Sequence, residues 1–221
     1  MALSDLVLAA TAGFFARAIA LATAAAPLAA DMVPAGALGL GVVAAAAAVG
    51  TLRFALGAGK ASMLGMIHAQ LASAASNVGI VLIAADVAFT LAPRALGAVL
   101  PPSMWASAVA AVIAGHIILG SRVPGYGAVL PLVAVLAAAG AGIRAEDHVD
   151  PLLGYTAVAG AACIVVAAAV GVSGELRGIY RVNIFHYVLA WALWLWANVL
   201  LDTRGVGGGP RPGLLLHLAP E

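Results

Sequence analysis

The stretch GMIHAQLASAASNVGIVLIAADVAFTLA, from Gly65 to Ala92, decides the fold of this chain. It contains no Lys or Arg, and its one acidic residue is Asp86. Because a helix of about 20 predominantly apolar residues crosses the ~30 Å hydrocarbon core of a bilayer, the stretch predicts a membrane-spanning helix. Polar side chains such as His68 and Asn77 interrupt it, and they raise the question of what this helix faces.

The composition of the whole chain places it in a membrane. Hydrophobic residues make up 64% of the sequence and charged residues only 9%, whereas a soluble domain carries about 25% charged residues. The net charge of +1 comes from scattered Lys and Arg, which excludes nucleic-acid binding and a polybasic strip for anionic lipid. The single Cys163 excludes an internal disulfide and a multi-cysteine metal site. We therefore expect an integral protein of the cell membrane, with membrane lipids as partners.

Pro, Gly and charged residues divide the chain into seven apolar segments separated by short connections. The sequence predicts an all-α, polytopic membrane protein with a seven-transmembrane-helix bundle over residues 1–203 and a flexible Gly- and Pro-rich tail over 204–221. The expected spans are 4–26, 36–56, 61–90, 102–121, 125–143, 151–172 and 182–201. Homo-oligomerisation is left open.

The distribution of Lys and Arg in the connections predicts the orientation. With seven spans, the side of the N-terminus holds Arg53, Lys60, Arg122, Arg177 and Arg181, and the other side holds four Arg. Since the cytoplasmic side carries the excess of Lys and Arg, we expect the N-terminus in the cytoplasm.

Three histidines share one depth in this topology. His68 lies ~10 Å into the third span, His116 lies near the cytoplasmic end of the fourth, and His186 lies about one turn into the seventh. Three imidazoles and a water are a common zinc arrangement, so these three are candidate metal ligands. The alternative for each is an interhelical hydrogen bond or a place in the headgroup zone.

The third span carries a broad polar face that should avoid lipid, so we expect it in the bundle interior. Ser73 and Asn77 on this face are candidate catalytic or substrate-holding residues; interhelical hydrogen bonding is the alternative for both. Asp86 lies ~27 Å along the helix from His68 and cannot serve the same site. We expect Asp86 to face the outer interface or to pair with Arg17.

Short motifs resemble a known superfamily. The segments SNVGIVLIAADVAFTLAP at 76–93 and NIFHYVLA at 183–190, with His68 after a helix start that contains Ser62, are similar to the seven-transmembrane superfamily of alkaline ceramidases and the hemolysin III and adiponectin-receptor proteins. This resemblance implies an inner-leaflet zinc, with His186 and His68 among its ligands. It also implies a paired histidine four residues before His186 and an Asp in the middle motif; this chain has Val182 at the first position and Ser76 or Asn77 at the second.

Three classes of function remain from the sequence. The first is a zinc-dependent lipid amide or ester hydrolase, in which His68, His116 and His186 hold the metal and Ser73 or Asn77 steadies the oxyanion. The second is a non-catalytic membrane protein of the same fold that binds a lipid or small ligand. The third is a small-solute transporter that uses the polar third helix as its pathway.

Overall fold

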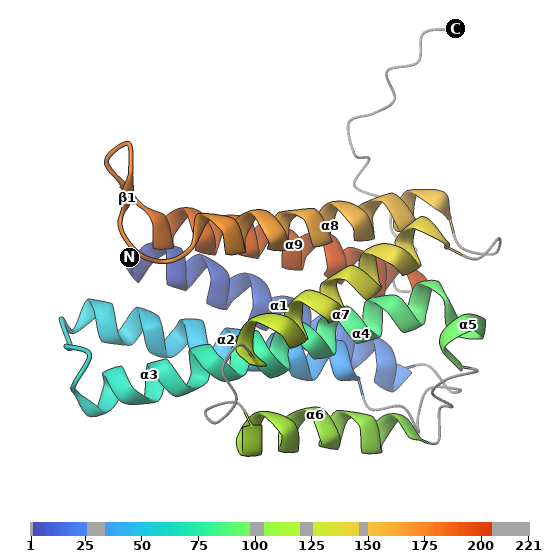
Figure 1. Cartoon of the computed structure of the whole chain (residues 1–221), viewed down its shortest axis with the longest axis horizontal. Helices are drawn as coiled ribbons and strands as arrows, with labels where there is room; N and C mark the ends of the chain where they lie inside the picture. The colour runs from blue at the N-terminus through green and yellow to red at the C-terminus, as the bar shows by residue number, and fades with distance from the viewer. Residues whose placement is uncertain (1, 26–33, 98–103, 120–125, 146–149, 205–221) are drawn as a thin grey trace, which may run out of the picture.

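The computed structural model describes residues 2–25, 34–97, 104–119, 126–145 and 150–204. Within these ranges the chain is helical except for one short β-hairpin and the turns (Figure 1). In chain order the elements are α1 (Ala2–Ala25), α2 (Ala35–Ala55), α3 (Met63–Ala74), the π-helical turn η1 (Ala75–Gly79), α4 (Ile80–Leu91), α5 (Pro93–Gly97), α6 (Trp105–Leu119), α7 (Tyr126–Ile143), α8 (Pro151–Val170), β1 (Glu175–Leu176), β2 (Ile179–Tyr180) and α9 (Arg181–Thr203). The predicted all-α class is confirmed.

Five helical segments in the described part of the chain are long and apolar enough to span a membrane. They are α1, α2, the continuous run Met63–Leu91, α8 and α9. The apolar helical stretches Trp105–Leu119 and Ala128–Ile143 are shorter. This arrangement is consistent with the predicted integral membrane protein. The predicted tail at 205–221 lies outside the described residues.

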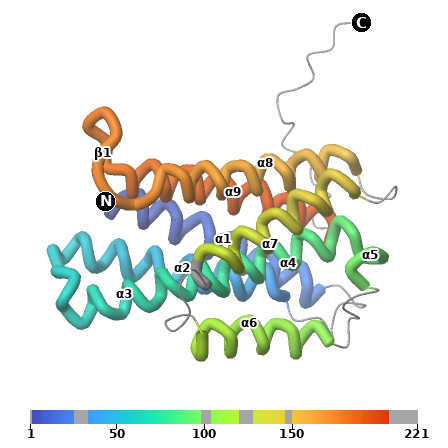
Figure 2. Tube along the Cα trace, viewed as in Figure 1, coloured from blue at the N-terminus to red at the C-terminus, as the bar shows by residue number. Residues whose placement is uncertain are grey.

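The two ends of the bundle carry different connections. The N-terminus, the turn between α2 and α3 and the β1–β2 hairpin lie at one end, on the left of Figure 1. The start of α8, the end of α9 and α5 lie at the opposite end (Figure 1), and the trace in Figure 2 shows the same distribution. Successive long helices therefore run in opposite directions between these two ends.

The core forms where small residues let helices approach closely. A Cβ at Gly39 of α2 would lie 2.5 Å from the carbonyl oxygen of Gly79, so only glycine permits this contact with η1. Between α8 and α9, the indole N–H of the fully buried Trp196 donates a 2.9 Å hydrogen bond to the carbonyl of Ala157. Close backbone approach of this kind is the usual way that helices associate in lipid.

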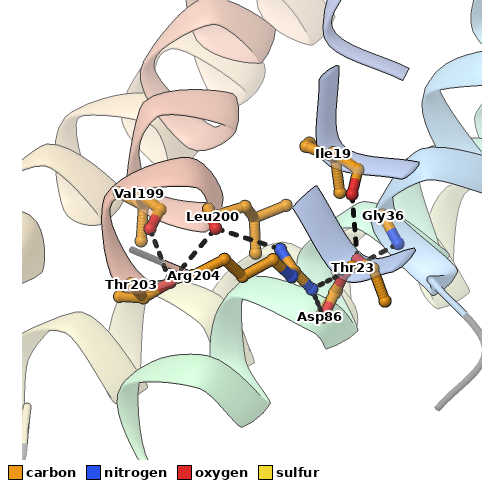
Figure 3. Close-up of polar contacts among 8 residues, drawn as sticks. All are labelled: Ile19, Thr23, Gly36, Asp86, Val199, Leu200, Thr203 and Arg204. Carbon is orange, nitrogen blue, oxygen red and sulfur yellow. Dashed lines mark hydrogen bonds and ion pairs between the residues drawn. The ribbon is translucent and has the colours of Figure 1, made fainter. Parts of the chain in front are cut away.

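One end of the bundle is held by an ion pair (Figure 3). Asp86 of α4 is 3% exposed and accepts bonds of 2.9 Å at both carboxylate oxygens from the guanidinium of Arg204, at the end of α9. Asp86 also accepts a 2.8 Å bond from the backbone N–H of Gly36, in the first turn of α2. Arg204 was assigned to the tail by the sequence, yet it closes α9 with a bond of 3.1 Å to the carbonyl of Leu200.

The expected pairing of Asp86 with Arg17 was wrong. The Asp86 side chain is buried, and the cation that it contacts is Arg204, whereas Arg17 is exposed on α1. The misassignment has a simple cause: Arg204 lies 118 residues away in sequence, and only the packing of α4 against α9 brings the two groups together.

Only the second half of the predicted third span lies in the interior of the bundle. Asn77 and nine of the twelve residues of α4 are buried, but the only buried residue of α3 is Gly65. Gln70 of α3 and Ser76 of η1 are exposed. The predicted interior placement therefore holds from Asn77 onward and fails for most of α3.

Candidate functional site

An apolar cavity of about 480 Å³ lies among six helical segments, within the size range of small-ligand sites, about 300–1,000 Å³. Residues of α1, α2, the run from α3 through η1 into α4, α7, α8 and α9 line it. Its polar lining residues are Asp5, His68, Ser76 and His186, and all the others are apolar. The cavity therefore offers a hydrophobic body and a few polar groups.

The cavity opens on the side of the bundle. Leu132 of α7 and Val165 of α8 line it, yet they are 50% and 45% exposed. Ala72 of α3 and Ser76 of η1 are also exposed lining residues. If the long helices span a membrane, this opening faces hydrocarbon, so an apolar ligand could enter from the lipid.

His186 lies at the centre of a polar cluster, at the end of the cavity that is lined by the start of α1. Its Nδ1 lies 3.1 Å from Asp5 Oδ1 and 3.4 Å from Ser4 Oγ. The Ser4 hydroxyl donates to Asn183 Oδ1 over 3.0 Å, so it faces His186 as an acceptor. Both neighbours of Nδ1 are thus acceptors, which places the proton of the neutral ring on Nδ1 and leaves Nε2 as its acceptor nitrogen.

His68 lines the same cavity from α3, and its ring also carries the proton on Nδ1. Its Nδ1 lies 3.2 Å from the carbonyl oxygen of Ala46. A carbonyl can only accept, so Nδ1 is the donor and Nε2 of the neutral ring is an acceptor. The Phe54 ring and the imidazole pack in a T-shaped arrangement, with the ring centroids 6.3 Å apart.

Gly50 of α2 makes room for this cluster. A Cβ at Gly50 would lie 2.9 Å from His68 Cε1 and 3.1 Å from Asp5 Cγ. The two side chains therefore share the space that a larger residue would fill, although they come from α3 and α1. This close approach brings an imidazole and a carboxylate to one end of the cavity.

Asp5 is the residue that sequence reasoning missed. Its side chain is 1% exposed. Neither carboxylate oxygen has a hydrogen-bond partner among the described residues. The Asp5 carboxylate lies within ion-pair distance of His186, but the contact lacks the geometry of a hydrogen bond. The available signal was an acidic residue in the first turn of an otherwise apolar helix. That signal is weak, because acidic residues are common at helix N-termini, where they interact favourably with the macrodipole.

The cluster is not arranged as a Ser-His-Asp triad. In such a triad the carboxylate and the hydroxyl contact opposite nitrogens of the imidazole. Here Asp5 and Ser4 contact the same nitrogen, Nδ1 of His186. Ser4 is therefore not placed as a nucleophile activated by His186.

His116, Asn77 and Ser73 form a second polar group. Asn77 Nδ2 lies 3.3 Å from His116 Nδ1 on α6 and 3.5 Å from Ser73 Oγ on α3. None of the three lines the cavity. The structure thus brings His68 and His186 to one site and places His116 with the two candidate catalytic residues at another.

The three histidines predicted as zinc ligands lie in two separate places. In the described part of the chain, no group of three or more His, Cys, Asp or Glu side chains is placed to hold a metal ion. His116 lies outside the lining that His68 and His186 share. The structure therefore separates His116 from His68 and His186, and the zinc site stays a prediction.

Comparison with models of known families, with characterised proteins and with solved structures found no match to this chain. The resemblance to the ceramidase and adiponectin-receptor superfamily therefore stays a prediction.

Proposed function

We propose that this protein binds a lipid or small amphiphilic ligand within the membrane, with the apolar part of the ligand in the cavity and its polar group at Asp5, His68 and His186. The observation that carries the proposal is the cavity itself: its volume is about 480 Å³, its lining is apolar except at this cluster and Ser76, and lining residues on α7 and α8 are exposed. Ligand sites are commonly mostly apolar, with a few polar groups that fix orientation.

The same proposal includes a seven-span bundle in the cell membrane with a cytoplasmic N-terminus. Support comes from the helices found in all seven expected ranges and from the described helices, which run in alternating directions between the two ends (Figure 1). In this topology the Asp5 cluster lies at the cytoplasmic end and the Asp86 cluster at the outer end.

Saturable binding of tritiated dodecanol to the full-length protein in phosphatidylcholine nanodiscs tests ligand binding, with empty nanodiscs as background. Ala72→Trp should abolish the saturable component, because Ala72 lines the opening of the cavity. Ala69→Trp is the matched control, since Ala69 is an exposed alanine on the same helix outside the lining. The proposal fails if no saturable component exists, or if the two variants behave alike.

A zinc-dependent hydrolase is the second candidate, favoured by one observation. Nδ1 of both His68 and His186 faces an oxygen acceptor, as in histidines that bind metal through Nε2. A third ligand is lacking among the described residues, so we derive no hydrolytic step. Elemental analysis of the purified protein separates the candidates: near-stoichiometric zinc that is lost in a His68→Ala, His186→Ala double variant would favour the hydrolase.

A further inference from the structure

The polar end of the cavity is rich in acceptors and poor in donors. Asp5 presents two carboxylate oxygens that lack a hydrogen-bond partner in the described part of the chain. His68 directs its Nδ1 proton to the carbonyl of Ala46, and Nδ1 of His186 contacts the hydroxyl oxygen of Ser4, which donates its own proton to Asn183. Each neutral ring therefore keeps an acceptor at Nε2. A ligand that matches this end must therefore supply donors.

Burial makes the unpartnered carboxylate significant. Asp5 is 1% exposed, and a buried ionised carboxylate without hydrogen bonds is strongly unfavourable in the apolar interior. The described residues supply no cation within ion-pair distance other than His186. A ligand cation that reached Asp5 would both pair its charge and satisfy its oxygens, which gives the carboxylate the character of an anchor.

Because Gly50 has no side chain, a small group can reach the Asp5 carboxylate. A Cβ there would crowd both His68 and the Asp5 carboxyl. The polar group of the ligand must likewise be compact, because His186 lies against Asp5 and the backbone at Gly50 lies close to both Asp5 and His68. Among common cations, a primary ammonium is compact and carries three N–H donors, whereas a quaternary ammonium is larger and carries none.

We propose that the ligand of this cavity is a single-chain primary amine in its protonated form. Its ammonium group pairs with Asp5 and donates to the acceptor nitrogens of His68 and His186, and its hydrocarbon chain lies along the apolar lining. This inference rests on the proposed ligand-binding function and names its ligand class. It assigns to Asp5 the role of charge anchor.

The test is displacement of tritiated dodecanol from the full-length protein in nanodiscs. The competitors are dodecylamine, unlabelled dodecanol, dodecyltrimethylammonium and dodecanoate, which share one chain and differ in the polar group. We expect dodecylamine to compete about ten- to a hundredfold better than dodecanol. Charge-assisted hydrogen bonds are roughly twice as strong as neutral ones, and a tenfold gain in affinity requires only a small gain in binding free energy. Dodecyltrimethylammonium and dodecanoate should be the weakest competitors.

Asp5→Asn should remove the preference for the amine over dodecanol, because the ratio of the two affinities depends on the charge of Asp5. Asp202→Asn, which changes an exposed carboxylate at the far end of α9, should keep the preference. Should Asp5→Asn not fold, the competitor series on the unsubstituted protein still decides the question. Equal competition by amine and alcohol, or an Asp5→Asn variant that still prefers the amine, would overturn the inference and leave ligand binding intact. Absence of any saturable dodecanol or amine binding would overturn both.

Discussion

At the residue scale, the cluster at the N-terminal end depends on a position without a side chain. Gly50→Ala would bring a Cβ to 2.9 Å from His68 Cε1 and 3.1 Å from Asp5 Cγ, distances that force both groups to move. We expect it to lower the stability by about 1–3 kcal/mol, as overpacking does, and to weaken dodecanol and dodecylamine binding. Thermal unfolding in detergent and the nanodisc binding assay measure the two effects.

Gly41→Ala is the control for this prediction. Gly41 lies on the same helix, and a Cβ there would meet nothing within 4 Å. Since alanine is the better helix former by about 1 kcal/mol in a helix interior, this variant should be neutral or slightly stabilised and should bind normally. The account of the cluster would be wrong if the two substitutions had equal effects.

The ion pair at the other end makes a separate residue-scale prediction. Asp86→Asn removes the charge that binds Arg204, and loss of one partner of a buried pair costs about 3–5 kcal/mol. Because the Arg204 side chain is 17% exposed, we expect about 3 kcal/mol, the lower end of that range. Unfolding of the purified protein in detergent measures it.

A double variant identifies the cause of that loss. If the cost comes from an uncompensated guanidinium, Asp86→Asn combined with Arg204→Met should cost less than the sum of the two single variants. Asp202→Asn is the control, because it changes an exposed carboxylate two residues before Arg204. It should alter stability by no more than about 0.5 kcal/mol. Strict additivity would show that Asp86 and Arg204 contribute independently.

At the scale of elements, the π-helical turn η1 sets the relative rotation of α3 and α4. Such a turn holds one residue more than an α-helix would, and it often occurs at functional sites. Deletion of Ser76 should restore a continuous α-helix and rotate α3 by about 100° relative to α4. His68 would then leave the cavity, and saturable dodecylamine binding should be lost while helix content by circular dichroism is kept.

Ser76→Ala keeps the number of residues and removes only the hydroxyl, so it serves as the matched control. It should retain the rotation of α3 and most of the binding. A deletion variant that folds and binds like the unsubstituted protein would show that η1 does not position His68.

At the scale of the whole molecule, the number of spans decides which side of the membrane each connection faces. A seven-span bundle with a cytoplasmic N-terminus places Leu119, at the end of α6, in the cytoplasm; a five-span bundle that leaves α6 and α7 on one side places it outside. In a Cys163→Ala background, Leu119→Cys should react with an impermeant maleimide only after cells are permeabilised. Lys60→Cys should behave in the same way, and Asp202→Cys should react in intact cells.

Labelling of Leu119→Cys in intact cells, with Lys60→Cys still protected, would contradict the seven-span bundle and favour five. Reversal of the Lys60→Cys and Asp202→Cys results would instead contradict the predicted orientation. The experiment therefore separates the two parts of the topology.

The amino-acid sequence by itself determined the helical character of this protein and the presence of helices long and apolar enough to span a membrane, because apolar segments of about 20 residues must satisfy their backbone groups within one helix. It also singled out His68 and His186, which share a cavity. It could not find Asp5, the Asp86–Arg204 pair or the separation of His116, since those depend on which helix faces which. Only tertiary packing, set by close contacts at positions such as Gly39 and Gly50, decided that the polar residues form two separate groups and that one lies at the end of an apolar cavity.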